Sequence, residues 1–156
     1  MLYISLILNI NYHIHEIATG EKMAIIGRKL FEEVDKPTGF KIVSESPEEI
    51  ETEARWIGEI NGFNGFPDGK KVGSGRSLQG ANGVTISNWQ GIFTTNDEHK
   101  LTFRGHDMNR NGRFIVLRTY FTNSESLSWM NGLICILEGA FDPDTKEFRS
   151  TGYEWV

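Results

Sequence analysis

Short turn signals recur along most of the chain, and their spacing limits the folds that the segments between them can adopt. Asn-Gly steps occur at 82–83 and 111–112, and a Pro-Asp-Gly turn occurs at 67–69. Asn-Gly supplies the positive φ angles of a tight hairpin turn, and Pro-Asp-Gly is typical of a reverse turn. The segments between these signals have the length of strands. The pattern therefore predicts an all-β protein.

Period-two alternation of apolar and charged residues at 50–56 is the pattern of a strand with one face in water. Hairpin-length loops make consecutive strands antiparallel. Closure into a barrel leaves no exposed edge, so we predict a single antiparallel up-and-down barrel of about eight strands, with a two-sheet sandwich as the alternative. The expected strands are 40–44, 50–59, 71–79, 84–94, 100–107, 113–122, 129–141 and 148–155.

The length and charge of the chain limit the kinds of function that it can have. The 156 residues are enough for one domain with a substantial core. The net charge is −5, and the segment 44–59 is strongly acidic. Because nucleic-acid binders gain affinity from clustered Lys and Arg, we expect no nucleic-acid partner. The single cysteine, Cys135, lies in an apolar run, so we expect a buried and unreactive thiol and no intrachain disulfide.

The first ten residues are apolar but too short to span a bilayer, and they lack the features of a signal peptide. We therefore expect a cytoplasmic protein with no membrane partner. Residues 1–22 are interpreted as an N-terminal extension, either a first strand or sequence translated upstream of a start at Met23, and we favour the second. Residues 23–156 form the predicted barrel domain.

Charged residues inside apolar segments are the candidates for function. Glu138 lies within the apolar run 133–141, which indicates a strand buried on both faces, and Arg118 lies within the similar run 114–121. A buried carboxylate needs a partner or a raised pKa, so we predict that Glu138 and Arg118 pair inside the barrel. Such a pair can be purely structural or can hold an anionic ligand.

Further lumen residues are predicted from aromatic and polar side chains next to glycines, which leave room for a ligand or for close packing. The predicted ligand-binding residues are Glu138, Arg118, Arg104, Trp89, Tyr120 and Trp155, with Cys135 as an apolar lining residue.

Histidines give little support for metal or nucleophilic chemistry. His13 and His15 would face the same side of a strand, but no third ligand follows at a useful spacing. His106 and Asp107 could form a general base, yet no activated nucleophile lies beside them. We expect no metal and no cofactor.

The stretch 90–156 resembles a family of small, functionally uncharacterised archaeal and bacterial proteins. The resemblance is carried by 90–97, by Phe103-Arg104-Gly105, by Met130-Asn131-Gly132 with Leu137-Glu138, and by Tyr153-Glu154-Trp155. It implies a barrel of the lipocalin or allene-oxide-cyclase kind and supplies no catalytic residues.

The leading functional hypothesis is a barrel that binds a small hydrophobic or anionic molecule. One alternative is a non-metal isomerase or cyclase that uses a buried carboxylate, with Glu138 as its acid or base. The other is a filled barrel that acts as a homo-oligomeric scaffold. The sequence leaves open the identity of the ligand, whether the protein is an enzyme, and its oligomeric state.

Overall fold

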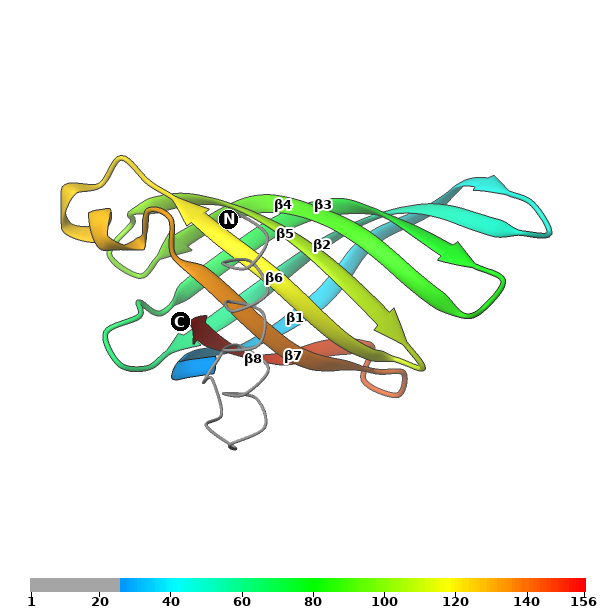
Figure 1. Ribbon diagram of the computed structural model, residues 1–156. Coiled ribbons are helices and arrows are strands. Elements are labelled where there is room, and N and C mark those ends of the chain that lie inside the picture. Colours follow the sequence, from blue (N-terminus) through cyan, green and yellow to red (C-terminus); the bar gives the residue numbers. More distant parts are fainter. Residues whose placement is uncertain (1–25) are drawn as a thin grey trace, which may run out of the picture.

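The computed structural model describes residues 26–156, and it shows a closed eight-stranded barrel in which every neighbouring pair of strands is antiparallel (Figure 1). The strands follow one another around the barrel in chain order, and β1 pairs with β8 to close it. The strands are β1 (Ile26–Glu45), β2 (Glu49–Gly62), β3 (Gly69–Gly80), β4 (Val84–Thr95), β5 (Lys100–Arg110), β6 (Arg113–Phe121), β7 (Ile134–Asp142) and β8 (Glu147–Trp155). The predicted up-and-down barrel is confirmed, and the sandwich alternative is wrong.

Two predicted strands had the wrong extent. β1 begins at Ile26 rather than at Phe40, because Pro37 and Gly39, which look like a turn, form an irregularity within one long strand. The segment 129–141 is divided, since Trp129 belongs to a short 3₁₀ helix, η1 (Glu125–Met130), and β7 begins only at Ile134. The prediction for residues 1–22 lies outside the described part of the chain.

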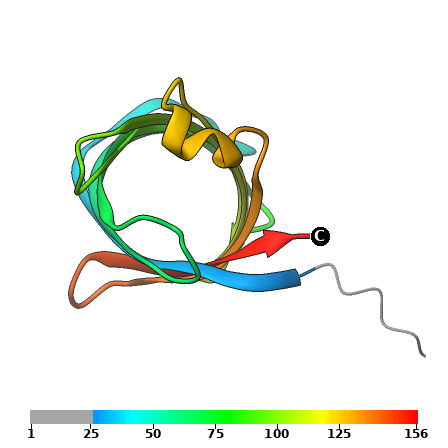
Figure 2. The ribbon, with the colours of Figure 1, turned by 90° about the vertical axis from the view of Figure 1, so that its left-hand side faces the viewer.

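The barrel has a closed end and an open end. Figure 2 looks along the barrel from the end where η1 and the β2–β3 loop lie. Phe66 from that loop and Met130 from η1 are buried there, and the ring of Phe66 packs against Phe31 at a centroid distance of 4.7 Å and against Tyr120 at 5.6 Å. At the other end the long β1–β2 hairpin projects beyond the remaining strands (Figure 1). Apolar packing therefore fills the barrel on the η1 side.

Glycines on the inner face make room for large rings. A Cβ atom at Gly75 would overlap the ring of Trp89, and one at Gly73 would overlap the ring of Trp56. Each glycine lies on β3, directly beside the strand that carries the ring it accommodates. The tryptophans can therefore lie flat against the barrel wall instead of filling its centre.

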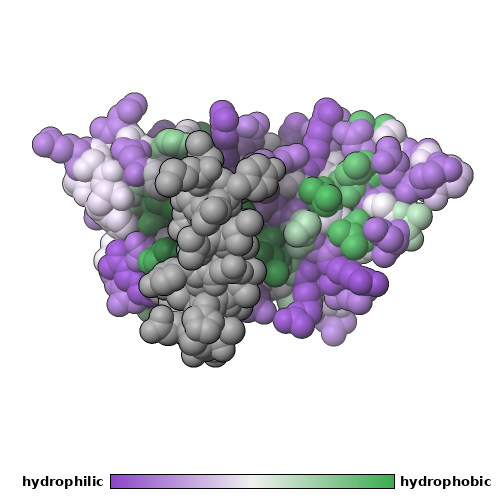
Figure 3. All heavy atoms as spheres, viewed as in Figure 1, coloured by the Kyte–Doolittle hydropathy of each residue, from purple (hydrophilic) through white to green (hydrophobic). Residues whose placement is uncertain are grey.

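The outer face carries apolar as well as hydrophilic side chains (Figure 3). On β6, Ile115, Leu117 and Phe121 point outward and are about half exposed. The apolar runs of β6 and β7 therefore do not mean burial on both faces within this chain, as the sequence had indicated. No helix within residues 26–156 is long and apolar enough to cross a membrane.

We expect Gly75→Ala to destabilise the barrel by about 1–3 kcal/mol, because the new methyl group forces the Trp89 ring off the wall. Gly39→Ala is the matched control, since its Cβ would have no neighbour closer than 3.9 Å and should cost little. Urea denaturation of both variants measures the difference. Equal stabilities of the two variants would show that the packing of the Trp89 ring does not require the space left by the missing side chain of Gly75.

Candidate functional site

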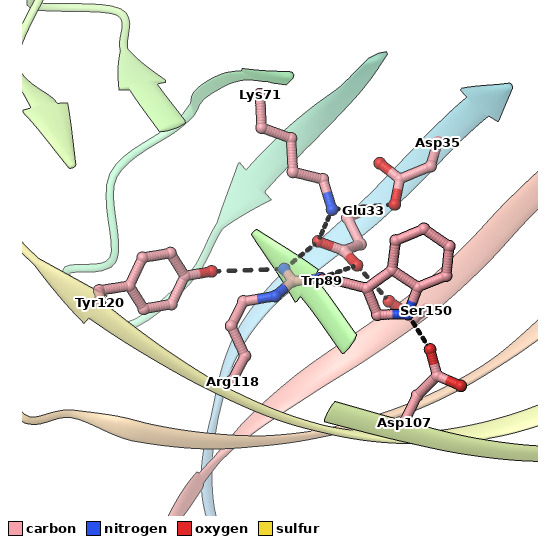
Figure 4. A network of polar contacts seen from close by, with 8 residues as sticks. All are labelled: Glu33, Asp35, Lys71, Trp89, Asp107, Arg118, Tyr120 and Ser150. Carbon is pink, nitrogen blue, oxygen red and sulfur yellow. Dashed lines mark hydrogen bonds and ion pairs between the residues drawn. The ribbon is translucent and has the colours of Figure 1, made fainter. Parts of the chain in front are cut away.

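A network of buried charged side chains crosses the interior of the barrel, between its packed half and its open half (Figure 4). At its centre is the carboxylate of Glu33 on β1. Glu33 accepts two hydrogen bonds from Arg118, of 2.6 and 3.0 Å, one from Lys71 of 2.5 Å and one from Ser150 of 2.8 Å. Four bonds use the full accepting capacity of a carboxylate. The network ties β1 to β3, β6 and β8.

The strand register explains how these residues meet. Glu33 and Ser150 are direct cross-strand partners on β1 and β8. Asp35, Gly58 and Lys71 form one row across β1, β2 and β3. Because Gly58 has no side chain, Lys71 reaches across it, and its Nζ donates to Asp35 Oδ2 at 2.9 Å. A Cβ at Gly58 would overlap Asp35.

Burial and pairing set the charge states of this network. Burial alone would raise the pKa of Glu33, but Arg118 and Lys71 together outweigh burial and lower this pKa to about 2. For Asp35 burial wins over the attraction of Lys71, and the pKa is raised to about 6. Burial, and then the nearby Arg118, lower the pKa of Lys71. Two carboxyl groups on one strand therefore have widely separated pKa values.

A cavity of about 360 Å³ lies above the network, in the half of the barrel opposite η1. Its walls are largely apolar and include Trp56, Trp89, Phe114, Val116 and Phe148. This volume is at the lower end of the range for small-molecule sites.

Polar side chains line part of this cavity, and three of them are buried ionisable groups on different strands. They are Asp35 on β1, Asp107 on β5 and Arg118 on β6. Arg118 has both terminal nitrogens bonded to Glu33. Each of the two carboxyl groups, in contrast, has one oxygen without a hydrogen-bond partner in the described chain.

Asp107 forms a second polar pair on the cavity wall. Its Oδ2 accepts a hydrogen bond from the indole Nε1 of Trp89 on the neighbouring strand β4. Burial raises the pKa of Asp107 against the effect of that bond. Within residues 26–156, Asp35 Oδ1 and Asp107 Oδ1 are buried without a hydrogen-bond partner.

The structure places three of the predicted site residues inside the barrel. Arg118 and Trp89 line the cavity, whereas Tyr120 is fully buried in the packed half next to η1 and does not line the cavity. Burial raises the pKa of Tyr120 above its ordinary value, and Arg118 donates to its hydroxyl oxygen at 3.4 Å. Cys135 is buried, as predicted, and burial raises the pKa of its thiol to about 12. Whether these residues bind a ligand stays a prediction.

The other three predicted residues face outward, and the predicted Glu138–Arg118 pair is wrong. Alternate residues of a strand point to opposite faces, so with Leu137 inside, Glu138 lies outside and pairs with Arg113 at 3.1 Å. Arg104 lines a shallow groove on the outer surface, and Trp155 is half exposed. The same alternation separates the predicted pair His106 and Asp107.

Sequence reasoning missed Glu33, Asp35, Lys71 and Ser150. The signal was weak, because 31–35 reads Phe-Glu-Glu-Val-Asp, with a charged residue on both faces of the strand.

No group of three or more His, Cys, Asp or Glu side chains in the described residues is arranged to hold a metal ion.

Comparison with known proteins supports the fold. No protein-family model and no curated protein matches the sequence. A solved protein of unknown function from Clostridium acetobutylicum ATCC 824 is similar with a TM-score of 0.71 and 12% identity, over 83% of this chain and 95% of the other. A β-barrel-like protein from Acinetobacter baumannii AYE is similar with a TM-score of 0.72 and 12% identity, over 83% of this chain and 94% of the other. An enzyme from Penicillium herquei is similar with a TM-score of 0.60 and 19% identity, over 83% of this chain and 96% of the other.

At these identities the similarity shows the barrel fold alone. Uncharacterised barrel proteins are among the structures that this chain resembles, which agrees with the predicted resemblance to small uncharacterised barrels. The narrower prediction, a lipocalin or allene-oxide-cyclase type, stays a prediction.

We expect Glu33→Gln to destabilise the protein by about 3–5 kcal/mol, because it leaves the buried cations of Arg118 and Lys71 without their main counter-charge. Glu138→Gln, which removes a carboxylate from the exposed pair with Arg113, should change the stability little. Urea denaturation at pH 7 compares the two variants. A similar loss in both would contradict the central role of Glu33.

Asp35 should make the stability depend on pH in a specific direction. Because folding raises its pKa from 3.8 to about 6, the folded state binds this proton more tightly, and the stabilisation present at low pH is lost as the pH rises through 6. Asp35→Asn removes this dependence. Between pH 4 and 7 the free energy of unfolding of the variant should rise by about 2 kcal/mol relative to that of the wild type. Parallel pH curves would show that Asp35 has an ordinary pKa.

Proposed function

We propose that the protein binds a small, largely apolar molecule in the cavity at the open half of the barrel, and that this molecule donates a hydrogen bond to Asp107. The observation that carries the proposal is a cavity with aromatic walls beside a buried carboxyl oxygen that lacks a donor. An unpaired buried acceptor costs about 1–3 kcal/mol, and a ligand with a hydroxyl or amine group would recover part of that cost.

The charges favour a neutral ligand over an anionic one. Arg118 faces the cavity, but its guanidinium is held by Glu33. No cationic side chain bonds to Asp107 in the described part of the chain, and its unpartnered oxygen would repel an anion. Of the two ligand classes that the sequence suggested, the hydrophobic class is the better match for this cavity.

The two alternatives match different parts of the molecule. An isomerase or cyclase needs a buried carboxyl group on the cavity, and Asp35 meets this need whereas the exposed Glu138 does not. A filled barrel describes the half next to η1, where the rings of Phe66 and Tyr120 pack together, but not the half that holds the cavity. Assembly into oligomers stays a prediction.

Blocking the cavity should abolish binding. Val116 lines the cavity, and its neighbour Ile115 is 60% exposed on the opposite face of β6. With 2-naphthol as the probe, which has an aromatic body and one hydroxyl donor, Val116→Trp should weaken binding by about tenfold or more and Ile115→Trp should not. Isothermal titration calorimetry measures both affinities. Equal binding by the two variants would place the probe outside the cavity.

The polarity of the proposed contact can be reversed. In Asp107→Asn the amide oxygen can still accept from Trp89, while the amide NH₂ offers a donor where the wild type has an acceptor. The wild type should prefer 2-naphthol to 2-methoxynaphthalene by about tenfold, and the variant should lose or invert this preference. A preference that Asp107→Asn leaves intact would remove Asp107 from the proposed contact.

A further inference from the structure

Asp35 differs from the other charged groups of the buried network in having accepting capacity left. Glu33 is fully buried, and its four hydrogen bonds occupy it completely. Asp35 has one hydrogen bond, from Lys71 to Oδ2, and its Oδ1 has no partner in the described chain. Its side chain lines the cavity and is 10% exposed. Asp35 is therefore the carboxyl group of the network that a bound molecule can approach.

The surroundings of Asp35 suit a group that exchanges a proton near neutral pH. The charged groups that face it are Lys71 and Arg118, which favour its ionised form, and Glu33, which opposes it. Burial is the largest influence, and the resulting pKa of about 6 makes Asp35 a stronger base than an ordinary aspartate. General bases work best when their pKa lies near the working pH. Glu33, with a pKa of about 2, is the fixed counter-charge beside it.

We propose that Asp35 is a general base that removes a proton from carbon in a neutral, apolar substrate held in the cavity. This activity rests on the proposed binding function. Asp35 is presented to the cavity by β1 and is fixed by Lys71, which reaches it across Gly58. Lys71 touches no ligand position in this arrangement and is a positioning residue.

The proton-transfer step is balanced without a redox partner. A lone pair on the Asp35 carboxylate forms the new O–H bond, the substrate C–H bond breaks, and its electron pair moves into an adjacent electron-withdrawing group. In an isomerisation the same proton returns from Asp35 to a different carbon of the substrate. The carboxyl group ends the cycle ionised, and no oxidant or reductant is consumed. A dry, apolar cavity strengthens such a base because water no longer stabilises its charge.

The experiment uses 5-nitrobenzisoxazole, a neutral aromatic probe that reports a general base by a colour change. Removal of its ring C–H proton breaks the N–O bond and releases a coloured nitrophenolate that carries a nitrile. We expect the full chain to accelerate this reaction, with a rate that rises through a pH limb near 6. Asp35→Asn should lose about 100-fold or more of the rate and should lose the limb.

Two controls keep the outcome interpretable. Glu138→Gln removes an exposed carboxylate on the outer face of the barrel and should retain the full rate and the limb. Urea denaturation of Asp35→Asn should give a single cooperative transition, which shows that the variant is folded and that a lost rate reports the missing carboxylate.

The outcomes separate this inference from the binding function. If the wild type binds 2-naphthol but reacts with the probe no faster than Asp35→Asn does, the general base is overturned and the binding function stands. If the reaction is fast but unchanged by Asp35→Asn, the base is another group and the inference is also overturned. If the wild type binds neither molecule, both proposals fail.

Discussion

The bonds to the Glu33 carboxylate hold the barrel in one arrangement. Removing a charged group from water costs several kcal/mol unless its partners are well placed, and Glu33 finds its four donors on three other strands. A slip of one residue in the pairing of β1 would turn Glu33 to the outside and leave Arg118 and Lys71 buried alone. The register of the closed barrel and the charge balance of its interior therefore depend on each other.

The glycines on the inner face decide which part of that interior is solid. A barrel of eight strands is just wide enough for its own side chains to fill. On the η1 side Phe31 lies against Gly152, and the rings of Phe66 and Tyr120 occupy the centre. In the half opposite η1, Trp56 and Trp89 lie against glycines of β3 and stay near the barrel wall, so a cavity remains between them. The cavity is thus a consequence of where glycine stands next to an aromatic residue.

The barrel could be predicted from sequence because turn residues act locally. Asn111 and Gly112, for example, both adopt positive φ angles at the β5–β6 turn, which is the conformation that this dipeptide favours. The lumen could not be predicted so well, because it depends on which of two alternating faces points inward. In β7 both faces are apolar near Glu138, since part of the outer surface is apolar too, and the pattern gave no way to choose.

β1 presented the opposite difficulty. Its charged residues lie on both faces, and a proline and a glycine interrupt the pattern, so the strand that supplies Glu33 and Asp35 went unrecognised. The hydrogen-bond partners of Glu33 and Asp35 lie 36 to 117 positions away in the sequence, and no local signal connects them. Arg118 was found because it lies alone in an apolar strand, but its partner could be identified only once the strands were placed in register.

The distribution of unpaired polar atoms separates the scaffold from the site. A barrel with a purely structural interior would need its two buried cations, Arg118 and Lys71, to be matched by carboxylates, and Glu33 and Asp35 supply them. It would not need carboxyl oxygens without a hydrogen-bond partner, yet Asp35 Oδ1 and Asp107 Oδ1 are both buried without one in the described chain, which lowers the stability. Both belong to residues that line the cavity. Proteins retain such destabilising groups where function requires them, and here both lie on the wall of the cavity of about 360 Å³.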